Sequence, residues 1–596
     1  MAYILISLLL AVLPLRTQAS WTGILGAAHQ QPLIGPGMGR PNIVFILTDD
    51  QDLHMQSLDY MPFVKSHLVK QGTSFQRHFC TTALCCPSRV SLWTGKAAHN
   101  TNVTDVVPPY GGYPKFVSQG LNDKYLPVWL QKAGYNTYYT GKLFNAHSVD
   151  TYHSPFAAGW TGSDFLLDPF TYWYMNSTYQ RNQDPPVSYE GQHTVDVLAE
   201  KAIALLKEAY HDRKPFFLGI APVAPHSDIQ SPAFKYGNHS NLTEVKFAPP
   251  VPAKRHAHLF EGTKVPRTPH FNPDTPSGAS WIRNLRKQDP DVVEFNDHFY
   301  VQRLRALQSV DEIVDRVVRS LENLGILENT YLIYTTDNGY HIGQHRLQPS
   351  KQSSFEEDIN IPLIIRGPGV PKNYKTDIVT THTDLAPTLL QIAGAPLHDD
   401  FDGVAIPLTQ AGLDQAKVGR HEHVTVEHWG YASNEGQVLD WYPRVTMNNT
   451  YKAIRVIGKS YNLHYQVWCN NEHELYDLNT DPGQMVNLLR HDEGLASRLL
   501  GLPLDTIAQR LDSLLFVLKS CRAQTCIEPW RALHPGGNVE TLQDALSPRF
   551  DEFYEARAEG VRFDRCESGY ILDAEGPQHE RSAVELELHP KWHEWT

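Results

Sequence analysis

The sequence predicts an α/β fold: a mixed, mainly parallel sheet between two layers of helices, with a small antiparallel sheet near the C-terminal end. Two observations lead to this prediction. From about residue 40 onward, short apolar segments typical of buried strands alternate with segments that repeat apolar residues at helical spacing. After about residue 430 the segments become short and alternate polar with apolar residues, which is the pattern of antiparallel strands.

The alternating part begins with an expected strand at 42–50. It continues with helices at 61–72 and 125–134, a strand at 135–142, a helix at 194–212, a strand at 215–226, a helix at 301–324, strands at 330–339 and 361–367, and a helix at 384–395. The helix at 301–324 has the clearest pattern, because Leu304, Leu307 and Val310 begin an apolar stripe and Gly325 ends it. Such alternation predicts parallel strands with helices on both faces of the sheet.

The later segments are expected strands at 423–429, 451–458, 461–468 and 473–478, followed by a helix near 504–520. We therefore predict a first domain over 40–430 and a C-terminal subdomain with a tail over 431–596. The stretches 150–190 and 228–295 are rich in Pro, His, Tyr and Asn and show little periodicity. Since they are too long for ordinary connections, we expect them to be loops over the edge where the strands end.

The chain has 596 residues and a formal net charge of −13, with acidic and basic residues interspersed. Without a basic face, we expect no nucleic-acid partner. The N-terminus has an apolar run that is too short to span a bilayer and is followed by small residues, which predicts a signal peptide over 1–19; a buried strand is the alternative. Since no later segment is long and apolar enough to span a membrane, we expect a soluble protein that is secreted to the medium or cell wall.

The glycosylation sites and the cysteines also bear on the expectation that the protein is secreted. Asn-x-Ser/Thr triplets, at which N-glycosylation would agree with secretion, occur at Asn102, Asn176, Asn238, Asn241 and Asn448. Seven cysteines are an odd number for a secreted protein, so one remains over after pairing. Cys521 and Cys526 are close enough in sequence for a local disulfide, and we expect the remaining cysteine among Cys80, Cys85 and Cys86.

Two acidic pairs each follow a predicted strand: Asp49 with Asp50, and Asp337 with Asn338. Because the carboxyl ends of parallel strands meet at one edge of a sheet, the pairs are expected to lie together. Three carboxylates and an amide oxygen would repel one another unless a cation lay among them, and hard oxygen ligands favour Ca²⁺ or Mg²⁺ over zinc. For either pair alone, a helix cap or a turn is the alternative.

Lys142 and His226 occupy further positions near strand ends, and Lys351 lies in an expected loop. Each alone could be a surface lysine or a packed histidine. Together with a cation they would form a pocket for a small tetrahedral oxyanion. Cys85 precedes a Pro-Ser pair that opens a helical pattern, so it would lie at a helix N-terminus, where anions and activated cysteines are favoured. From these residues alone, Cys85 is either a nucleophile or half of a disulfide.

The segment Cys85-x-Pro87-Ser88-Arg89, followed by Thr94-Gly95-Lys96, resembles the signature of the formylglycine-dependent sulfatases. Further segments occur in the family's order: "NIVFILTDDQ", "GK" at 141–142, "APVAPHS", "TTDNGYHIGQH" and "ELYDLNTDPGQMVNL". The sequence is most similar to the branch that contains fungal arylsulfatases and N-acetylglucosamine-6-sulfatases. The resemblance implies an alkaline-phosphatase-like fold, which agrees with the predicted architecture, and makes 40–430 the sulfatase domain.

The resemblance also implies the chemistry. An aldehyde-generating enzyme of the endoplasmic reticulum, the formylglycine-generating enzyme, would convert Cys85 to formylglycine (3-oxoalanine), and one Ca²⁺ per chain would bind beside it. One hydroxyl of the aldehyde hydrate attacks sulfur, and the second then loses its proton and expels sulfate. Removing Cys85 also leaves an even number of thiols. By matching motif, the cation ligands would be Asp49, Asp50, Asp337, Asn338 and residue 85, and the catalytic residues would be Cys85, Arg89, Lys142, His226 and Lys351.

One departure from the family pattern concerns the base that deprotonates the hydrate. Many sulfatases have histidine two places after the lysine that corresponds to Lys142, whereas this chain reads "GKLFNAHS". Asn145 matches the asparagine of the glucosamine-6-sulfatase branch, and His147 or His341 could supply the base instead. The sequence leaves these three candidates open.

The leading interpretation is a sulfuric ester hydrolase of the arylsulfatase type, acting on a small-molecule sulfate ester. A glycan sulfatase acting on N-acetylglucosamine 6-sulfate is the first alternative, and a phosphonate or phosphate monoester hydrolase is the second. A non-catalytic binding protein with Cys80, Cys85 and Cys86 in structural disulfides is a third, of a different class. Aromatic residues of the two long stretches suit either an aryl or a sugar ring: Tyr172, Trp173, Tyr174 and Trp281.

Overall fold

A ten-stranded sheet forms the centre of the protein in the computed structural model, which describes residues 39–229, 247–436, 445–490, 498–557 and 560–579. The strand order is β12-β2-β11-β10-β1-β7-β3-β4-β5-β6. In chain order the strands are β1 (Asn42–Thr48), β2 (Thr73–Phe79), β3 (Asn136–Gly141), β4 (Gly162–Leu166), β5 (Thr178–Arg181), β6 (Val187–Ser188), β7 (Phe216–Ala221), β10 (Thr330–Thr336), β11 (Leu363–Arg366) and β12 (Tyr374–Thr381).

The sheet is mixed and mainly parallel, as the sequence predicted. β10, β1, β7, β3 and β4 are parallel neighbours, and β12 is parallel to β2. β11 is antiparallel to both β10 and β2, and β5 is antiparallel to β4 and β6. The four central parallel strands β10, β1, β7 and β3 therefore end at the same edge of the sheet.

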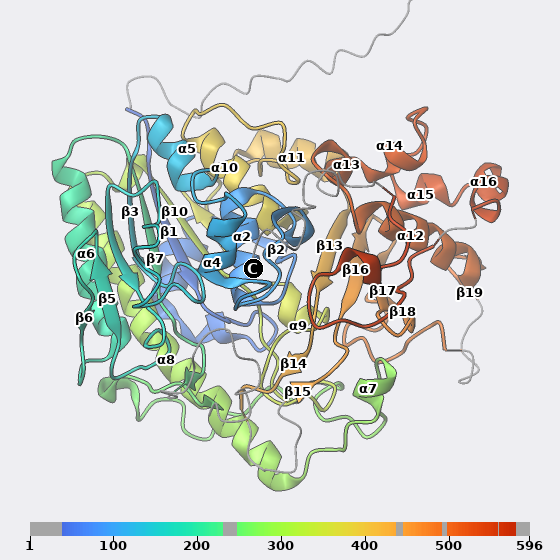
Figure 1. Ribbon diagram of the computed structural model, residues 1–596, viewed down its shortest axis with the longest axis horizontal. Coiled ribbons are helices and arrows are strands. Elements are labelled where there is room, and N and C mark those ends of the chain that lie inside the picture. Colours follow the sequence, from blue (N-terminus) through green and yellow to red (C-terminus); the bar gives the residue numbers. More distant parts are fainter. Residues whose placement is uncertain (1–38, 230–246, 437–444, 491–497, 558–559, 580–596) are drawn as a thin grey trace, which may run out of the picture.

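Helices cover both faces of this sheet (Figure 1). Ile43, Phe45 and Leu47 of β1 are fully buried on one face, in a core shared with α2 (Cys85–Thr94), α5 (Leu126–Lys132) and α10 (Leu385–Ile392). Val44 and Ile46 are buried on the other face, against α6 (Thr194–His211) and α8 (Pro290–Asn323). Because side chains alternate along a strand, one uninterrupted apolar segment supplies both cores.

The expected helices are present, with some changes at their ends. The helix expected at 61–72 consists of α1 (Pro62–Val64) and a π-helical turn over Lys65–Val69. The helix expected at 301–324 is α8, which begins earlier, at Pro290. Proline is favoured at the first position of a helix, where its missing N–H is not needed, and the polar first turns conceal the apolar stripe from which the helix was predicted.

The prediction that 150–190 and 228–295 are loops is wrong in part. The first stretch contains β4, β5 and β6, which extend the main sheet beyond β3. The second includes a short hairpin of β8 (Asp228–Ile229) and β9 (Phe247–Ala248), the helix α7 (Ser280–Arg283) and the start of α8. These strands have two to five residues each, too few to show a local periodicity.

A four-stranded antiparallel sheet forms the C-terminal part, also as predicted. Its order is β13 (His423–His428), β16 (Tyr451–Ile457), β17 (Asn462–Trp468) and β18 (His473–Asp477), and α12 (Leu504–Leu518) packs on it. The other face of this sheet shares a core with Phe79, Phe355 and Ile359 of the first part of the chain. Figure 1 shows this sheet beside β2 and α9 (Glu356–Ile359). The domain boundary near residue 430 stays a prediction.

The cysteines are only partly as expected. The local disulfide Cys521–Cys526 is present, and Cys469 is joined to Cys566. Cys80, Cys85 and Cys86 are all buried free thiols. The six cysteines other than Cys85 therefore do not all pair, since Cys80 and Cys86 lie in separate apolar surroundings, Cys86 in the core beneath α2 and Cys80 in the core under the C-terminal sheet.

Several of the predicted secretion signals lie outside the described residues. Residues 1–19, Asn238 and Asn241 lie outside the described residues. Asn448 is exposed, while Asn102 and Asn176 are half-buried. Among the helices of the described residues, none is long and apolar enough to cross a bilayer.

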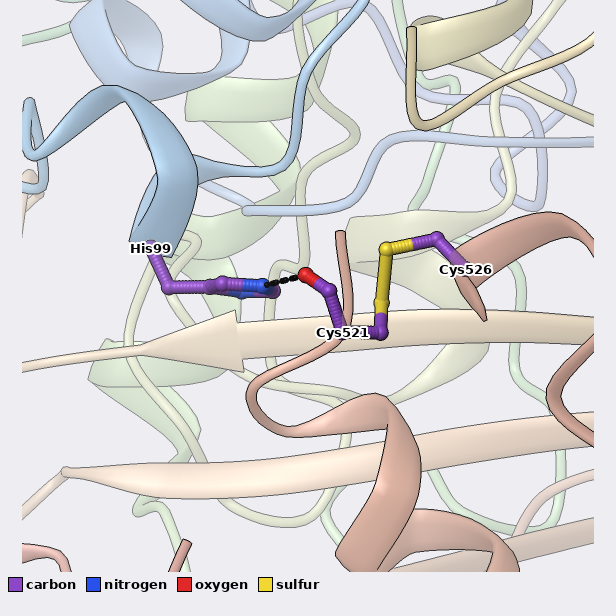
Figure 2. Close-up of side chains that lie close together, drawn as sticks. All are labelled: His99, Cys521 and Cys526. Atoms are coloured by element: carbon purple, nitrogen blue, oxygen red, sulfur yellow. Dashed lines mark hydrogen bonds between the residues drawn. A yellow bond between two sulfur atoms is a disulfide. The ribbon is translucent and has the colours of Figure 1, made fainter. Parts of the chain in front are cut away.

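A cluster of buried polar residues joins the C-terminal sheet to the segment that follows α2. His99, in α3 (Ala98–Thr101), has its Nδ1 2.8 Å from a carboxylate oxygen of Glu427 and its Nε2 2.8 Å from the carbonyl oxygen of Cys521. Figure 2 shows the contact with Cys521, whose sulfur is bonded to Cys526. Since both ring nitrogens face acceptors, His99 is held as a cation. Lys452 Nζ also lies 2.8 Å from Glu427.

This group predicts a pH-dependent contribution to stability. Burial alone would raise the pKa of Glu427 from its ordinary value of 4.5, but His99 and Lys452 outweigh burial and lower it to about 2. A lowered carboxyl pKa stabilises the fold above the ordinary value, and this stability is lost as the pH falls from 4.5 towards 2. We expect Glu427→Gln to lower the free energy of unfolding near pH 6 by about 3 kcal/mol. Urea unfolding between pH 6 and pH 3 measures this difference, which should shrink as the pH falls; a constant difference would contradict the explanation.

Candidate active site

The polar residues predicted to gather at one edge do so because they follow neighbouring parallel strands. Asp49 and Asp50 come directly after β1, and Asp337 with Asn338 directly after β10. Lys142 is the first residue after β3, and His226 lies in the turn after β7. All six side chains are buried.

Two of the carboxylates and the amide are linked by hydrogen bonds. Asp337 Oδ1 accepts the backbone N–H groups of Asp50, at 3.0 Å, and of Asn338, at 2.9 Å. Asn338 Nδ2 donates to Asp50 Oδ1 at 2.8 Å. Within the described part of the chain, Asn338 Oδ1 is buried without a hydrogen-bond partner. Such an oxygen beside three carboxylates fits a hard divalent cation, for which oxygens are the preferred ligands.

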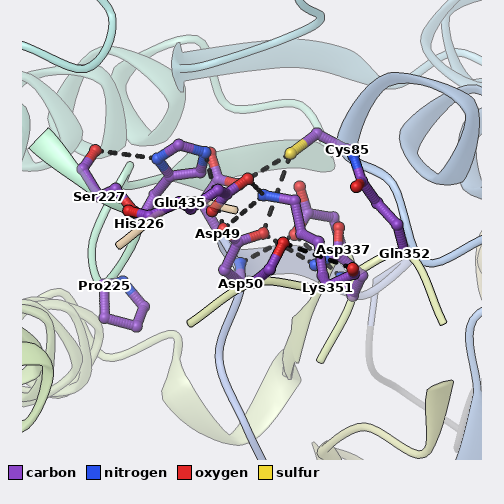
Figure 3. A network of polar contacts seen from close by, with 12 residues as sticks. Asp49, Asp50, Cys85, Pro225, His226, Ser227, Asp337, Lys351, Gln352 and Glu435 are labelled. Carbon is purple, nitrogen blue, oxygen red and sulfur yellow. Dashed lines mark hydrogen bonds and ion pairs between the residues drawn. The ribbon is translucent and has the colours of Figure 1, made fainter. Parts of the chain in front are cut away.

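Three cationic side chains balance the carboxylates (Figure 3 includes Lys351). Arg89 Nε lies 2.8 Å from Asp337, Lys142 Nζ 2.6 Å from Asp49, and Lys351 Nζ 2.6 Å from Asp50. Burial alone would raise the pKa of Asp49, but Lys142 and Arg89 outweigh it and lower this pKa to about 2. Asp49 is therefore held as an anion although it is shielded from water.

Cys85 is the first residue of α2, and it points at the same carboxylates. Its Sγ lies 3.4 Å from Asp49 Oδ1 and 3.9 Å from Asp50 Oδ1 (Figure 3). Burial, and after it the charge of Asp49, raises the pKa of the Cys85 thiol well above its ordinary value. The group is thus a protonated thiol and not the thiolate that a cysteine nucleophile requires.

His226 has a defined orientation in the site. Its Nδ1 faces the carbonyl oxygen of Ser227 at 2.9 Å and must carry a proton there, while Nε2 lies 3.6 Å from Asp50 Oδ2. The ring stacks on Tyr172 with 4.1 Å between centroids. Burial, followed by the charge of Lys351, lowers the pKa of His226 to about 4. Nε2 is therefore the ring nitrogen that faces the site.

The three residues considered for the missing family histidine are not equivalent. Asn145 lines the cavity at Cys85 and donates from Nδ2 to the Tyr172 hydroxyl at 2.8 Å. His147 is buried between the rings of Tyr113 and Phe165, and burial lowers its pKa to about 3. His341 bonds to Asp358 and lines a neighbouring depression. Of the three, only Asn145 lines the cavity at Cys85, and its amide can orient a hydroxyl group but cannot accept its proton.

The cavity at Cys85 also has residues that the sequence did not single out. Glu435 contacts Lys351, with 2.8 Å between Glu435 Oε1 and Lys351 Nζ. His428, the last residue of β13, lines the same cavity, as do Trp429 and Tyr431 in the segment that follows. These residues follow no parallel strand and belong to no recognised motif, so no signal in the sequence distinguished them from an ordinary loop.

The aromatic residues expected near the substrate have different positions. Tyr172 lines the cavity at Cys85, and Lys142 Nζ lies 5.0 Å from the centre of its ring. Tyr174 is buried, and its hydroxyl donates to the carbonyl oxygen of His226 at 2.8 Å. Trp281 lines the neighbouring depression beside Lys351, and Trp173 lines neither of these cavities.

Comparison with known proteins identifies the family of this chain. The family model described as "Sulfatase" matches residues 41–395, which include every residue placed at the site so far except Glu435, His428 and the segment after β13. The chain belongs to the sulfatase family. A second model, described as "N-sulphoglucosamine sulphohydrolase, C-terminal", matches residues 343–499. The family, the fold class and the enzyme class predicted from the sequence are confirmed.

Named relatives cover most of this sulfatase. It is 40% identical over 557 residues to an arylsulfatase of Volvox carteri, covering 89% of this chain and 80% of the relative. It is 37% identical to an arylsulfatase of Chlamydomonas reinhardtii, covering 87% and 80%. It is 29% identical to human N-acetylglucosamine-6-sulfatase, covering 83% and 87%. These similarities make the protein a sulfuric ester hydrolase.

Solved structures share the fold. BT4656, in complex with its substrate D-glucosamine-2-N,6-O-disulfate, has a TM-score of 0.59 and 21% identity, and covers 76% of this chain and 94% of its own. Ps i-CgsB in complex with k-i-k-neocarrahexaose has a TM-score of 0.54 and 17% identity, and covers 87% and 100%. At these identities the comparison concerns the fold alone.

The side-chain oxygens of Asp49, Asp50, Asp337 and Asn338, here called the oxygen cluster, predict that a divalent cation stabilises the folded protein. We expect CaCl₂ to raise the Tm relative to EDTA, because a ligand that binds only the native state stabilises it. Asp337→Asn should reduce this shift, since it removes a charged ligand and leaves the volume nearly unchanged. Asp402→Asn is the matched control: Asp402 is a buried carboxylate that bonds to Ala97 and Asn100 away from the cluster, so its variant should keep the full shift. Equal shifts in all three proteins would contradict the assignment of the ligands.

Proposed function

We propose that this sulfatase hydrolyses aryl sulfates through a formylglycine formed from Cys85, with one bound Ca²⁺. The observation that carries the proposal is the position of Cys85: the first residue of α2, in a Cys-x-Pro-x-Arg motif, within 4 Å of two carboxylates of the oxygen cluster. The arylsulfatase relatives at 40% and 37% identity support this substrate class.

The modification resolves a difficulty that the unmodified thiol presents. A protonated, buried thiol is a poor nucleophile, and it could not release sulfate once a thioester of sulfuric acid had formed. The formylglycine-generating enzyme would replace the thiol by an aldehyde whose hydrate has two hydroxyl groups. The Sγ atom of Cys85 stands where the oxygens of that hydrate would lie.

We assign different catalytic roles to the residues around Cys85. Asp49, Asp50, Asp337, Asn338 and residue 85 would hold the cation, which would supply positive charge to the sulfate oxygens and the nucleophile. Arg89 is fixed between Asp337 and the carbonyl oxygen of Lys142, where it stabilises the negative charge that develops at residue 85.

Lys142, Lys351 and His226 would act on the substrate itself. The two lysines are buried and charged. Sulfate oxygens would accept hydrogen bonds from their ammonium groups, which now donate to Asp49 and Asp50. His226 presents Nε2 to the site; because Nδ1 holds the proton of the neutral ring, Nε2 would first take up a second proton and then pass it to the departing oxygen of the alcohol. These roles follow the motif matches and stay proposals.

A glycan sulfatase acting on N-acetylglucosamine 6-sulfate is the second candidate. Trp429 and Tyr431 line the cavity together with His428 and Ser433, a mixture of aromatic and hydrogen-bonding groups that suits a sugar ring as well as an aryl ring. The relative named N-acetylglucosamine-6-sulfatase supports it at lower identity than the arylsulfatases.

We also propose that the protein is secreted. The signal segment at 1–19 and the Asn-x-Ser/Thr sites support this route, as do the two disulfides, which persist in oxidising compartments. The route would expose the unfolded chain to the formylglycine-generating enzyme, so localisation and chemistry depend on each other.

The adjacent cysteines allow a matched test of the nucleophile. Cys85→Ala should abolish hydrolysis of 4-nitrophenyl sulfate, because it removes the only source of the hydrate. Cys86→Ala should keep activity within about tenfold of wild type, because Cys86 packs in the core beneath α2 and its deletion costs only a small cavity. Release of nitrophenol measures both. Activity retained in Cys85→Ala, in protein produced by a cell able to make formylglycine, would overturn the proposal.

A further inference from the structure

Glu435 is a buried carboxylate with one oxygen occupied and one oxygen without a partner. Oε1 lies 2.8 Å from Lys351 Nζ, and the residue is 4% exposed. Among the described residues, Oε2 is buried and has no hydrogen-bond partner. An unsatisfied carboxyl oxygen in such a position is costly, because it has lost contact with water without gaining a donor, so it calls for a donor.

The position of Glu435 is fixed by its main chain. Its N–H donates to the carbonyl oxygen of Pro349 at 2.8 Å, and its carbonyl oxygen accepts the hydroxyl of Ser227 at 3.3 Å. Those contacts tie it to the loop that carries Lys351 and to the residue after His226. Figure 3 shows Glu435 beside His226. The carboxylate is therefore a built part of the cavity that Cys85 and His226 also line.

The donor that Oε2 needs cannot be the sulfate group. A sulfate monoester has only acceptor oxygens at neutral pH, and two acceptors repel each other. Besides a water molecule, the donor that a bound substrate can offer lies in its alcohol part, as an O–H or N–H close to the ester. A simple aryl sulfate has no such group, whereas a catechol, or a sugar sulfated on one of its ring hydroxyls, carries one on the neighbouring carbon. In a sugar 6-sulfate the neighbouring carbon bears the ring oxygen, and the nearest hydroxyl is one carbon further away.

We propose that Glu435 is a specificity-determining residue, whose Oε2 accepts a hydrogen bond from a hydroxyl or amide adjacent to the sulfate ester while Oε1 holds Lys351. This inference rests on the proposed function and narrows it to esters of alcohols with a neighbouring donor. Lys351 then lies between Asp50 on the cation side and Glu435 on the alcohol side.

Two chromogenic substrates separate the two tasks of Glu435. 4-Nitrocatechol sulfate carries a hydroxyl next to the ester, and 4-nitrophenyl sulfate has none. Any loss of Lys351 positioning in Glu435→Ala affects both substrates. Loss of the acceptor oxygen affects only the first, so we expect the ratio of kcat/KM for nitrocatechol sulfate over nitrophenyl sulfate to fall by about 10- to 100-fold.

Glu427→Gln is the matched control, since Glu427 is also a buried glutamate that holds a buried lysine but does not line the cavity. It should leave the ratio at the wild-type value even where it lowers stability, because a ratio does not depend on how much protein is folded. An unchanged ratio in Glu435→Ala would overturn the inference and leave Glu435 as a residue that only positions Lys351. Wild-type protein that hydrolyses neither ester would instead contradict the proposed function.

Discussion

The compensation of buried charge at the sheet edge is the constraint on which the rest of the site depends. Three aspartates without solvent contact each lie within ion-pair distance of a buried cationic side chain, from Arg89, Lys142 or Lys351. Removing one member of such a set typically costs about 3–5 kcal/mol, because it leaves an opposite charge buried and unpaired. The same balance would make the cluster responsive to ligands: a cation held by the aspartates would supply the positive charge that Lys142 and Lys351 now supply, and the two lysines would then be available to an anion.

This arrangement requires elements that are far apart in sequence to be held rigidly. The aspartates follow β1 and β10, Lys142 follows β3, and Arg89 comes from α2. The parallel pairing of the four central strands fixes their ends at one edge, and full burial on both faces fixes the sheet between its helices. The C-terminal sheet then closes the cavity, because the segment after β13 contributes Trp429, Tyr431 and Glu435.

The sequence predicted the parts of the site that follow strands. Asp49 and Asp337 were expected to meet because strand ends converge, and Lys142 was expected by the same rule. Lys351 lies in a loop, so no strand end placed it; its charge suggested a part in an oxyanion pocket, and only the family resemblance made it a catalytic residue. Glu435 was missed, because its place depends on how a second sheet packs against the first, and neither spacing nor motif encodes that packing.

The elements of the fold likewise include some that the sequence predicted and some that it did not. The helix α8 was predicted from its apolar stripe, but its start at Pro290 was missed because the first turns are polar on most sides. The sequence predicted loops where β4, β5 and β6 lie, because these are short strands at one side of the sheet, with too few residues for a periodic pattern. Burial on both faces leaves a strong local signal in sequence, whereas pairing at an edge leaves a weak one.

Mass spectrometry of the tryptic peptide from His78 to Arg89, taken from protein of the native source, tests the central claim most directly. The account predicts that residue 85 has lost its thiol and carries an aldehyde, while Cys80 and Cys86 in the same peptide remain thiols. Unmodified cysteine at positions 80, 85 and 86, in protein that hydrolyses sulfate esters, would contradict the formylglycine mechanism. Another nucleophile beside the oxygen cluster would then be required.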